Sequence, residues 1–249
     1  MEFCNVTAGY GKTPVLQNVC VTFRPGEITS IIGLNGSGKT TLLRCAARLM
    51  TTQSGAITLD GREITTLKPK DLARRIAILP QNRPVPDMCV ETMVLYGRYP
   101  HLHFGGSFSD NDFRIARQAM EQCGVHELRH RNVRTLSGGE RQRAYIAMAT
   151  AQDTDWLLLD EPAASLDLPH RMELLQLIRS LCREGKSILL VQHDLGDALT
   201  VSDRIAVMHE GRLRCTGTPE EIRTSGIFEE IFCVRPRQGE NGIWYFTPL

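Results

Sequence analysis

The chain has 249 residues, 42% of them hydrophobic, with 29 basic and 28 acidic side chains and a formal net charge of +1. This length allows one large domain or two small ones, and the balanced charge argues against holding nucleic acid or anionic lipid by bulk charge. No apolar run approaches the roughly 20 residues of a membrane-spanning helix. The start, Met1-Glu2-Phe3-Cys4-Asn5, lacks the pattern of a secretory signal, so we expect a cytosolic chain.

The first clear pattern is a strand, a glycine-rich loop and a helix. Residues Ile28 to Leu34 are apolar and rich in β-branched side chains, which predicts a buried strand. Apolar residues recur at helical spacing from Lys39 to Leu49. Two further short strands are expected, from Ala56 to Leu59 and from Ile76 to Leu79.

The middle of the chain has a different pattern. Helical spacing recurs at 90–97, 112–123 and 139–150, with little strand signal. The prolines between Pro80 and Pro86 break both helix and sheet, so we expect a hinge there. The sequence therefore predicts a helical insert within an α/β core.

Strands and helices alternate again from Trp156. We expect strands at 156–160, 187–192 and 204–208, with helices at 169–183 and 195–201 between them. Alternation of this kind predicts a mainly parallel sheet covered by helices on both faces. The tail from about Gly211 should hold a turn, two short helices and a final strand over Trp244-Tyr245-Phe246.

The glycine-rich segment Gly33-Leu34-Asn35-Gly36-Ser37-Gly38-Lys39-Thr40 predicts a triphosphate site. Gly36 and Gly38 allow successive backbone N–H groups to point inward, and the following helix adds its positive end. Lys39 can reach the β- and γ-phosphates, and the Thr40 hydroxyl can bind Mg²⁺. A plain glycine turn is the alternative.

Two acids end the strand at 156–160. A buried carboxylate at Asp160 needs a counter-charge, which Mg²⁺ would supply. Glu161 follows, where it could orient or deprotonate an attacking water. A helix cap or a buried ion pair is the alternative interpretation of these acids.

A second anion site is expected at Leu136-Ser137-Gly138-Gly139-Glu140, at the start of a helix. Ser137 and Glu140 also fit a capping box, which is compatible with anion binding because the same amides serve both. The glycine-rich loop already provides a phosphate site for one nucleotide, so a single chain does not need a second anion site. A head-to-tail pair in which each chain covers the other's nucleotide gives that second site a role.

These motifs, in this order, resemble the ABC-type ATPase family over nearly the whole chain. Gly33 to Thr40 looks like the Walker A loop, Leu157 to Glu161 like Walker B, and Leu136 to Glu140 like the signature. The resemblance implies a P-loop (RecA-like) α/β core with a mainly parallel sheet, an N-terminal antiparallel β portion and an inserted helical subdomain. Within a single domain at 1–249, it places the core at 1–86 and 151–210, the helical subdomain at 87–150, and a tail at 211–249.

The resemblance also assigns residues. Catalytic roles fall to Lys39, Gln81, Glu161 and His193. Contacts with ATP fall to Tyr10, Asn35, Gly36, Ser37, Gly38, Lys39, Thr40, Thr41, Ser137, Gly138, Gly139, Glu140 and Asp167. Ligands of Mg²⁺ are Thr40, Gln81 and Asp160.

The segment Tyr96-Gly97-Arg98-Tyr99-Pro100-His101 is similar to the importer ATPases for ferric siderophores, haem and cobalamin. That likeness implies an ATPase that works as a homodimer with polytopic membrane permease subunits, and indirectly with a substrate-binding protein, at the cytoplasmic face of the membrane. No nucleic acid is expected as a partner. His101 and His103 are interpreted as surface residues rather than metal ligands.

Two other functions remain open at this point. The chain could be an ABC ATPase of DNA repair, translation or iron–sulfur assembly, although tandem cassettes, long coiled coils and basic surfaces are not evident in the sequence. It could also be a P-loop kinase or GTPase, which would leave Ser137 to Gly139 and His193 unexplained. The eight cysteines are spread along the chain, and we expect them to be free, buried thiols.

Overall fold

The computed structural model describes residues 1–11, 13–103, 105–239 and 244–249. Within it the chain forms two compact units. One unit joins Met1–Leu67 to Ser187–Leu249, and the other is Lys68–Lys186. The class is α/β, as the alternation of strands and helices predicts.

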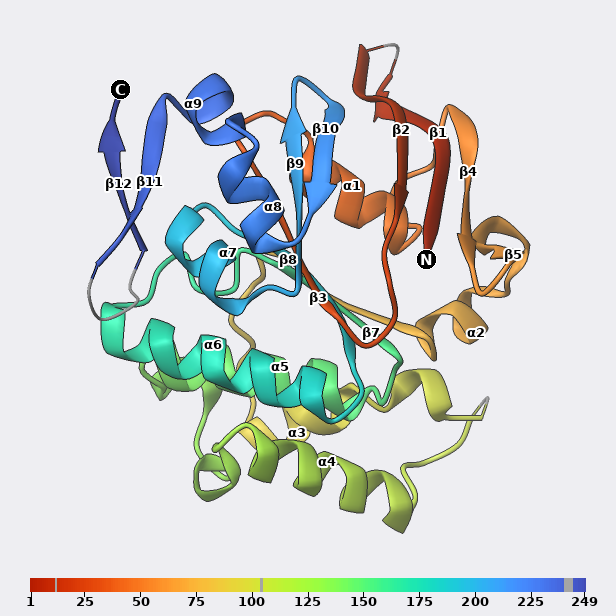
Figure 1. Ribbon diagram of the computed structural model, residues 1–249. Coiled ribbons are helices and arrows are strands. Elements are labelled where there is room, and N and C mark those ends of the chain that lie inside the picture. Colours follow the sequence, from red (N-terminus) through yellow and green to blue (C-terminus); the bar gives the residue numbers. More distant parts are fainter. Residues whose placement is uncertain (12, 104, 240–243) are drawn as a thin grey trace. The chain divides into compact units, whose positions relative to one another are not determined.

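An antiparallel sheet opens the first unit, drawn in red and orange in Figure 1. Its strands are β1 (Glu2–Tyr10), β2 (Thr13–Thr22), β4 (Ser54–Leu59) and β5 (Arg62–Glu63), in the order β2-β1-β4-β5. The short helix η1 (Ile64–Thr66) follows β5. Along β1 the buried side chains are Phe3, Val6 and Ala8 while Glu2 and Cys4 are exposed, the alternation of a half-buried strand.

The same unit holds four strands in the order β10-β9-β3-β8. Their bounds are β3 (Ile28–Gly33), β8 (Ser187–Val191), β9 (Arg204–His209) and β10 (Arg212–Gly217). β3 pairs in parallel with both β8 and β9, and every residue of β3 is buried. A strand that is buried along its whole length is typical of one covered on both faces.

Helices complete the first unit. α1 (Lys39–Ala46) follows β3, α7 (Leu195–Val201) joins β8 to β9, and α8 (Pro219–Thr224) and α9 (Ile227–Phe232) follow β10. Ile32, Val207 and Phe228 belong to one buried cluster that α7, α8 and α9 share with the sheet. The antiparallel pair β11 (Val234–Gln238) and β12 (Trp244–Pro248) ends the chain.

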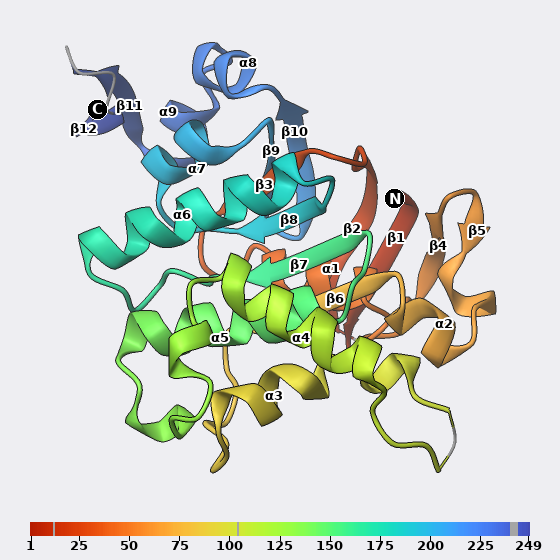
Figure 2. The ribbon, with the colours of Figure 1, turned by 90° about the horizontal axis from the view of Figure 1, so that it is seen from below.

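The second unit contains the parallel strands β6 (Ile76–Leu79) and β7 (Trp156–Asp160). Figure 2 shows three of its helices, α3, α4 and α5, lying side by side. The helices and short 3₁₀ turns of the unit are α2 (Pro69–Ala73), α3 (Val90–Tyr96), η2 (Tyr99–His101), α4 (Asp110–Gln122), η3 (His126–Leu128), η4 (Val133–Thr135), α5 (Gly138–Ala151) and α6 (Leu168–Arg183).

One buried ion pair fixes the start of α4. Ser109 and Asp112 form a capping box, and the Arg98 Nε donates to Asp112 Oδ1 at 3.0 Å. A second Arg98 nitrogen donates to the Ala151 carbonyl at 2.8 Å, at the end of α5. Burial alone would raise the pKa of Asp112, but its hydrogen bonds with Ser109 and Arg98 lower it below the ordinary value.

The structure corrects several boundaries expected from the sequence. The first helix ends at Ala46 rather than Leu49, because Arg48 takes a left-handed backbone conformation with φ of 54°. The tail contains two strands, β10 and β11, that helical spacing could not indicate. The segment between Pro80 and Cys89 has neither helix nor strand, and its role as a hinge stays a prediction.

The cysteines are free, but the expectation that they are buried is wrong for Cys4, Cys20 and Cys233, which are exposed. Burial raises the pKa of the Cys45 thiol to about 11 and that of Cys123 to about 12. Among the described helices, none combines the length and the apolar character that crossing a bilayer requires.

Candidate functional site

The glycine loop lies between the end of β3 and the start of α1, as the sequence predicts. Gly38 caps α1 with φ of 99°, a left-handed conformation that favours glycine. A Cβ at this position would lie 2.8 Å from Leu16 Cδ2. The backbone curl that gathers N–H groups for a phosphate therefore depends on glycine here.

Lys39 and Ser37 line this loop from the inside. Lys39 is only 5% exposed, and its Nζ donates to the carbonyls of Gly33 at 2.9 Å and Leu34 at 3.1 Å. The Ser37 hydroxyl is buried without a hydrogen-bond partner among the described residues. A buried ammonium and an orphaned hydroxyl beside a helix N-terminus fit a polyphosphate ligand.

Further sequence-predicted residues lie in the same unit. Asn35 and Gly36 are exposed in the loop, Thr40 is half-buried, and Thr41 is buried on α1. Tyr10 ends β1 with 56% of its surface exposed, and its hydroxyl accepts a hydrogen bond from Arg44 at 3.1 Å. A large exposed ring of this kind is available to stack on a base.

His193 is exposed and lies two residues beyond the end of β8. β8 pairs in parallel with β3, the strand that leads into the glycine loop. The carboxyl ends of parallel neighbours lie at one edge of a sheet, so His193 and the loop belong to the same edge of this unit.

The second unit carries the two acids. Asp160 is the last residue of β7 and is 3% exposed. Glu161 follows with φ of 49°, an uncommon backbone conformation for a residue with a side chain. Gln81, two residues after β6, donates from Nε2 to Glu161 Oε2 at 2.5 Å. The structure thus brings together Gln81 and Glu161, which the sequence separates by 80 residues.

Ser137 caps α5, so that Gly138 and Gly139 form the first turn of that helix. The Glu140 N–H donates to Ser137 Oγ at 3.3 Å, and the Ser137 N–H donates to Glu140 Oε2 at 2.8 Å. The hydrogen bond that the Ser137 N–H donates to the Glu140 carboxylate is the main reason why the pKa of Glu140 is lowered. The predicted capping box is confirmed, and Ser137 and Gly138 are exposed while Gly139 is buried.

Asp167 caps α6 and is paired with His170. The His170 N–H and ring Nδ1 lie 3.3 Å and 2.5 Å from Asp167 Oδ1, and the hydrogen bond with the His170 side chain lowers the pKa of Asp167. His170 also lies against the signature, because a Cβ on Gly139 would come within 2.6 Å of His170 Cδ2. Sequence reasoning missed this contact, which no motif signals.

The side chains that hold the segment after Gln81 were also missed. Arg83 lies over the Tyr145 ring, with its Cζ 4.2 Å from the ring centroid, and donates to Gln142 Oε1. The only hint in the sequence was that Gln142 and Tyr145 are three apart on one helix, on the face that holds the signature.

A family model described as "ABC transporter" matches residues 16–164 of this chain. The chain belongs to the ABC transporter family. It is an ATP-binding subunit and an ATPase of that family, and the glycine loop, residues 136–140 and the two acids follow one another in that order.

Curated relatives match over most of the chain. The ferric enterobactin transport ATP-binding protein FepC of Escherichia coli (strain K12) is 42% identical over 92% of this chain and 86% of its own length. The iron(3+)-hydroxamate import ATP-binding protein FhuC of Bacillus subtilis (strain 168) is 41% identical over 90% and 84%. The hemin import ATP-binding protein HmuV of Nocardia farcinica is 39% identical over 88% and 75%.

Solved structures agree on the fold. One chain of a putative metal-chelate type ABC transporter in an inward-facing conformation aligns with a TM-score of 0.85 at 24% identity, covering 100% of this chain and 96% of its own. A dimeric bacterial ABC transporter cassette aligns with a TM-score of 0.75 at 26% identity, covering 88% and 98%. The predicted P-loop ATPase fold with an N-terminal antiparallel sheet and a helical region is therefore confirmed.

Proposed function

We propose that this chain powers the import of an iron–siderophore, haem or cobalamin-type cargo through separate membrane subunits. The observation that carries the proposal is identity of about two residues in five, over nearly the whole chain, to ATP-binding proteins named for siderophore and hemin import. Such a chain works as a peripheral subunit at the cytoplasmic face of the membrane and reaches a substrate-binding protein only indirectly.

Two features of the second unit support docking of a permease helix. The first is an aromatic patch made of Tyr96, Tyr99, Phe108 and Phe113. Its neighbouring ring centroids are 5.0, 5.6 and 6.5 Å apart, and Tyr99 and Phe113 are 54% and 49% exposed. Exposed aromatic side chains that pack on one another are typical of protein interfaces.

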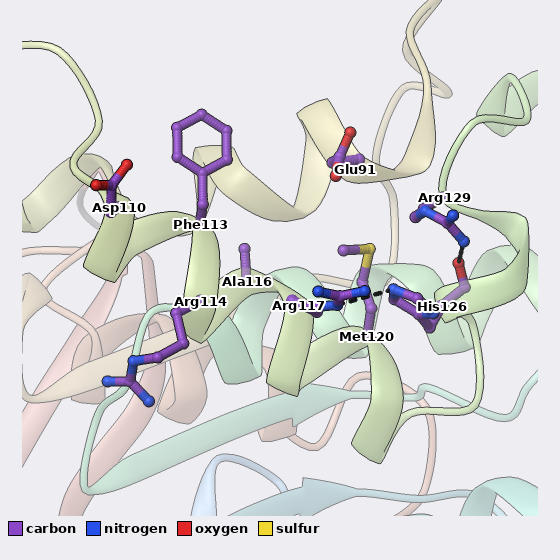
Figure 3. Close-up of a pocket in the computed structure, with 9 residues that line it drawn as sticks. All are labelled: Glu91, Asp110, Phe113, Arg114, Ala116, Arg117, Met120, His126 and Arg129. Carbon is purple, nitrogen blue, oxygen red and sulfur yellow. Dashed lines mark hydrogen bonds between the residues drawn. The ribbon is translucent and has the colours of Figure 1, made fainter.

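The second feature is a pocket of about 410 Å³ beside Phe113. Figure 3 shows Phe113 and Glu91 rising from α4 and α3, with Arg117 and His126 meeting nearby. Arg117 Nε donates to His126 Nε2 at 3.2 Å, and Arg129 donates to the His126 carbonyl at 3.2 Å. The lining combines apolar side chains with three arginines and two acids, which suits an amphipathic helix that carries charged residues.

The proposed chemistry assigns each predicted residue a task. Lys39 and the loop amides hold the β- and γ-phosphates of ATP, Tyr10 stacks on the adenine, and Glu161 accepts a proton from the attacking water. His193 contacts the γ-phosphate. Thr40, Gln81 and Asp160 would hold Mg²⁺, which neutralises charge on the phosphate oxygens when bound.

We further propose that ATP joins two copies head to tail. Ser137, Gly138 and Gly139 of one copy then complete the ATP site of the other, and Asp167 links the two sites. The exposure of Ser137 and Gly138 supports this arrangement, because a helix cap alone does not require exposure. Closure of the pair around ATP, and reopening after hydrolysis, drives the membrane subunits. The proposed moving parts are the core at 1–86 and 151–210, the helical subdomain at 87–150 and the tail at 211–249.

A pull-down from detergent-solubilised membranes tests the transport role. We expect a polytopic partner to co-purify with the native chain and with Tyr245→Ala, and to be lost with Tyr99→Ala. Tyr245 is the matched control, since it is 52% exposed but lies in β12, far along the chain from the aromatic patch. Recovery of a soluble complex instead would favour a role in repair, translation or iron–sulfur assembly and would overturn the transport proposal.

A further inference from the structure

The segment that follows Gln81 is held to α5 by side chains alone. Residues 81–87 form neither helix nor strand, and the next backbone tie comes only at Met88, whose carbonyl accepts from the Val133 N–H at 3.0 Å. Arg83 is the main contact. Its guanidinium stacks over the Tyr145 ring with Cζ 4.2 Å from the centroid, one nitrogen donates to Gln142 Oε1, and another donates to the Pro80 carbonyl at 2.5 Å.

Tyr145 contributes a second tie. Its hydroxyl donates to the Pro84 carbonyl at 3.0 Å, so the same ring that carries the arginine also holds the residue after it. Tyr145 is 5% exposed and Gln142 is 9% exposed, which makes this a buried set of contacts rather than a solvated pair. We call Arg83, Gln142 and Tyr145 the loop clamp.

The clamp is only partly satisfied in this conformation. Arg83 Nε and Gln142 Nε2 are buried without a hydrogen-bond partner in the part of the chain that the structure describes. Both residues line a cavity of about 300 Å³ together with Gln81, Gly138 and Glu161. Burial lowers the pKa of the Arg83 guanidinium, and Tyr145 opposes that shift. Either donor would gain by finding a partner, because a buried donor without one is costly.

Both ends of the clamp lead to proposed functional residues. On one side, Gln81 donates to Glu161 at 2.5 Å. On the other, Gln142 lies on α5 in the turn that follows the Ser137 cap. We propose that Arg83 is a positioning residue that makes Gln81 move with the signature helix. Through this clamp, the position of α5 sets where the Gln81 side chain lies relative to the Glu161 carboxylate. This inference rests on the proposed function, in which Glu161 is the catalytic base.

Steady-state ATP hydrolysis by Arg83→Ala, Gln142→Ala and the double variant tests the clamp. We expect kcat to fall about 10-fold in each single variant, because small misplacement of a positioned group has effects of this size. KM for ATP should stay within about 2-fold, since Lys39 and the glycine loop are untouched. The double variant should lose no more than either single variant, as residues that act as one unit are not additive.

Arg134→Ala is the matched control. Arg134 also bridges the segment after Gln81 to the segment before the signature, through an ion pair with Asp87 at 2.9 Å, but its side chain is 58% exposed. An exposed ion pair contributes little to stability, so the kcat of Arg134→Ala should remain within about 2-fold of native. Should Arg83→Ala unfold, Tyr145→Phe keeps the ring under Arg83, removes only the hydroxyl that donates to Pro84, and should still lower kcat at constant KM.

Native kcat in Arg83→Ala, losses that multiply in the double variant, or an equal loss in Arg134→Ala would each overturn the clamp. Glu161→Gln separates this failure from that of the proposed function. If Glu161→Gln is inactive while Arg83→Ala turns over at the native rate, only the clamp is wrong. If Glu161→Gln hydrolyses ATP at the native rate, the assignment of the base is wrong as well.

Discussion

Replacement of Arg98 by methionine should destabilise the second unit far more than replacement of a comparable exposed arginine. Arg98 is 3% exposed and donates to both Asp112 and the Ala151 carbonyl, at 3.0 and 2.8 Å. Arg98→Met keeps an apolar stem of similar length but leaves the Asp112 carboxylate buried without its counter-charge. Breaking a buried pair from one side costs about 3–5 kcal/mol. Asp112 keeps its hydrogen bonds with Ser109, so we expect the lower end of that range, about 3 kcal/mol.

Urea unfolding followed by tryptophan fluorescence can measure this free-energy cost for the structural unit that contains Arg98. The chain has two tryptophans, Trp156 in β7 and Trp244 in β12. A Trp244→Phe background leaves the buried Trp156 to report on the unit that contains Arg98. Arg117→Met is the control, because the Arg117–Glu121 pair on α4 is 63% and 54% exposed and should contribute less than about 1 kcal/mol.

The free energy of unfolding should also depend on pH through the Arg98–Asp112 pair. Asp112 has a pKa lowered from 3.8, so its contribution is complete above that value and is lost as the pH falls through the lower pKa of the folded state. The difference between native protein and Arg98→Met should therefore be largest near neutral pH and shrink in acid. Equal costs for Arg98→Met and Arg117→Met at pH 7 would refute the reasoning.

Three further predictions concern the glycine loop and its ligands. Lys39→Ala should abolish measurable ATP binding by calorimetry, since it removes the buried ammonium that lies 2.9 Å from the Gly33 carbonyl; unchanged affinity would overturn the loop assignment. Gly38→Ala should weaken ATP binding about 10-fold or more, because a left-handed residue with a side chain costs about 1–2 kcal/mol and the new Cβ meets Leu16; native affinity would contradict this. Removal of Mg²⁺ by chelation should stop hydrolysis reversibly, and continued hydrolysis in excess chelator would exclude the proposed metal ligands.

The sequence predicts the elements that carry local signals. The strand–loop–helix around Lys39 and the Ser137 cap are confirmed because glycine, β-branched and capping residues act within a few positions of one another. The β10 and β11 strands were not predicted. β10 does alternate exposed and half-buried residues, but both strands are short and depend on pairing with β9 and β12.

In the candidate site too, features with a local sequence signal could be predicted and contacts between distant residues could not. The positions of the glycine loop and of Glu161 follow from motifs, but the Gln81–Glu161 hydrogen bond joins residues 80 apart. The Arg83–Tyr145 contact spans a similar distance in sequence and involves a loop with no regular structure. Contacts of this kind depend on how β6, β7 and α5 pack, which no local pattern encodes.

The dependence of ATP turnover on protein concentration tests the shared site most directly. The purified native chain would be assayed at saturating ATP and Mg²⁺ over about a thousandfold dilution, with turnover expressed per chain. Because Ser137 to Gly139 are proposed to serve the ATP of a second copy, turnover per chain should fall toward zero as dilution separates the pair. Constant turnover across the whole range would mean that one chain holds a complete site, contrary to this account.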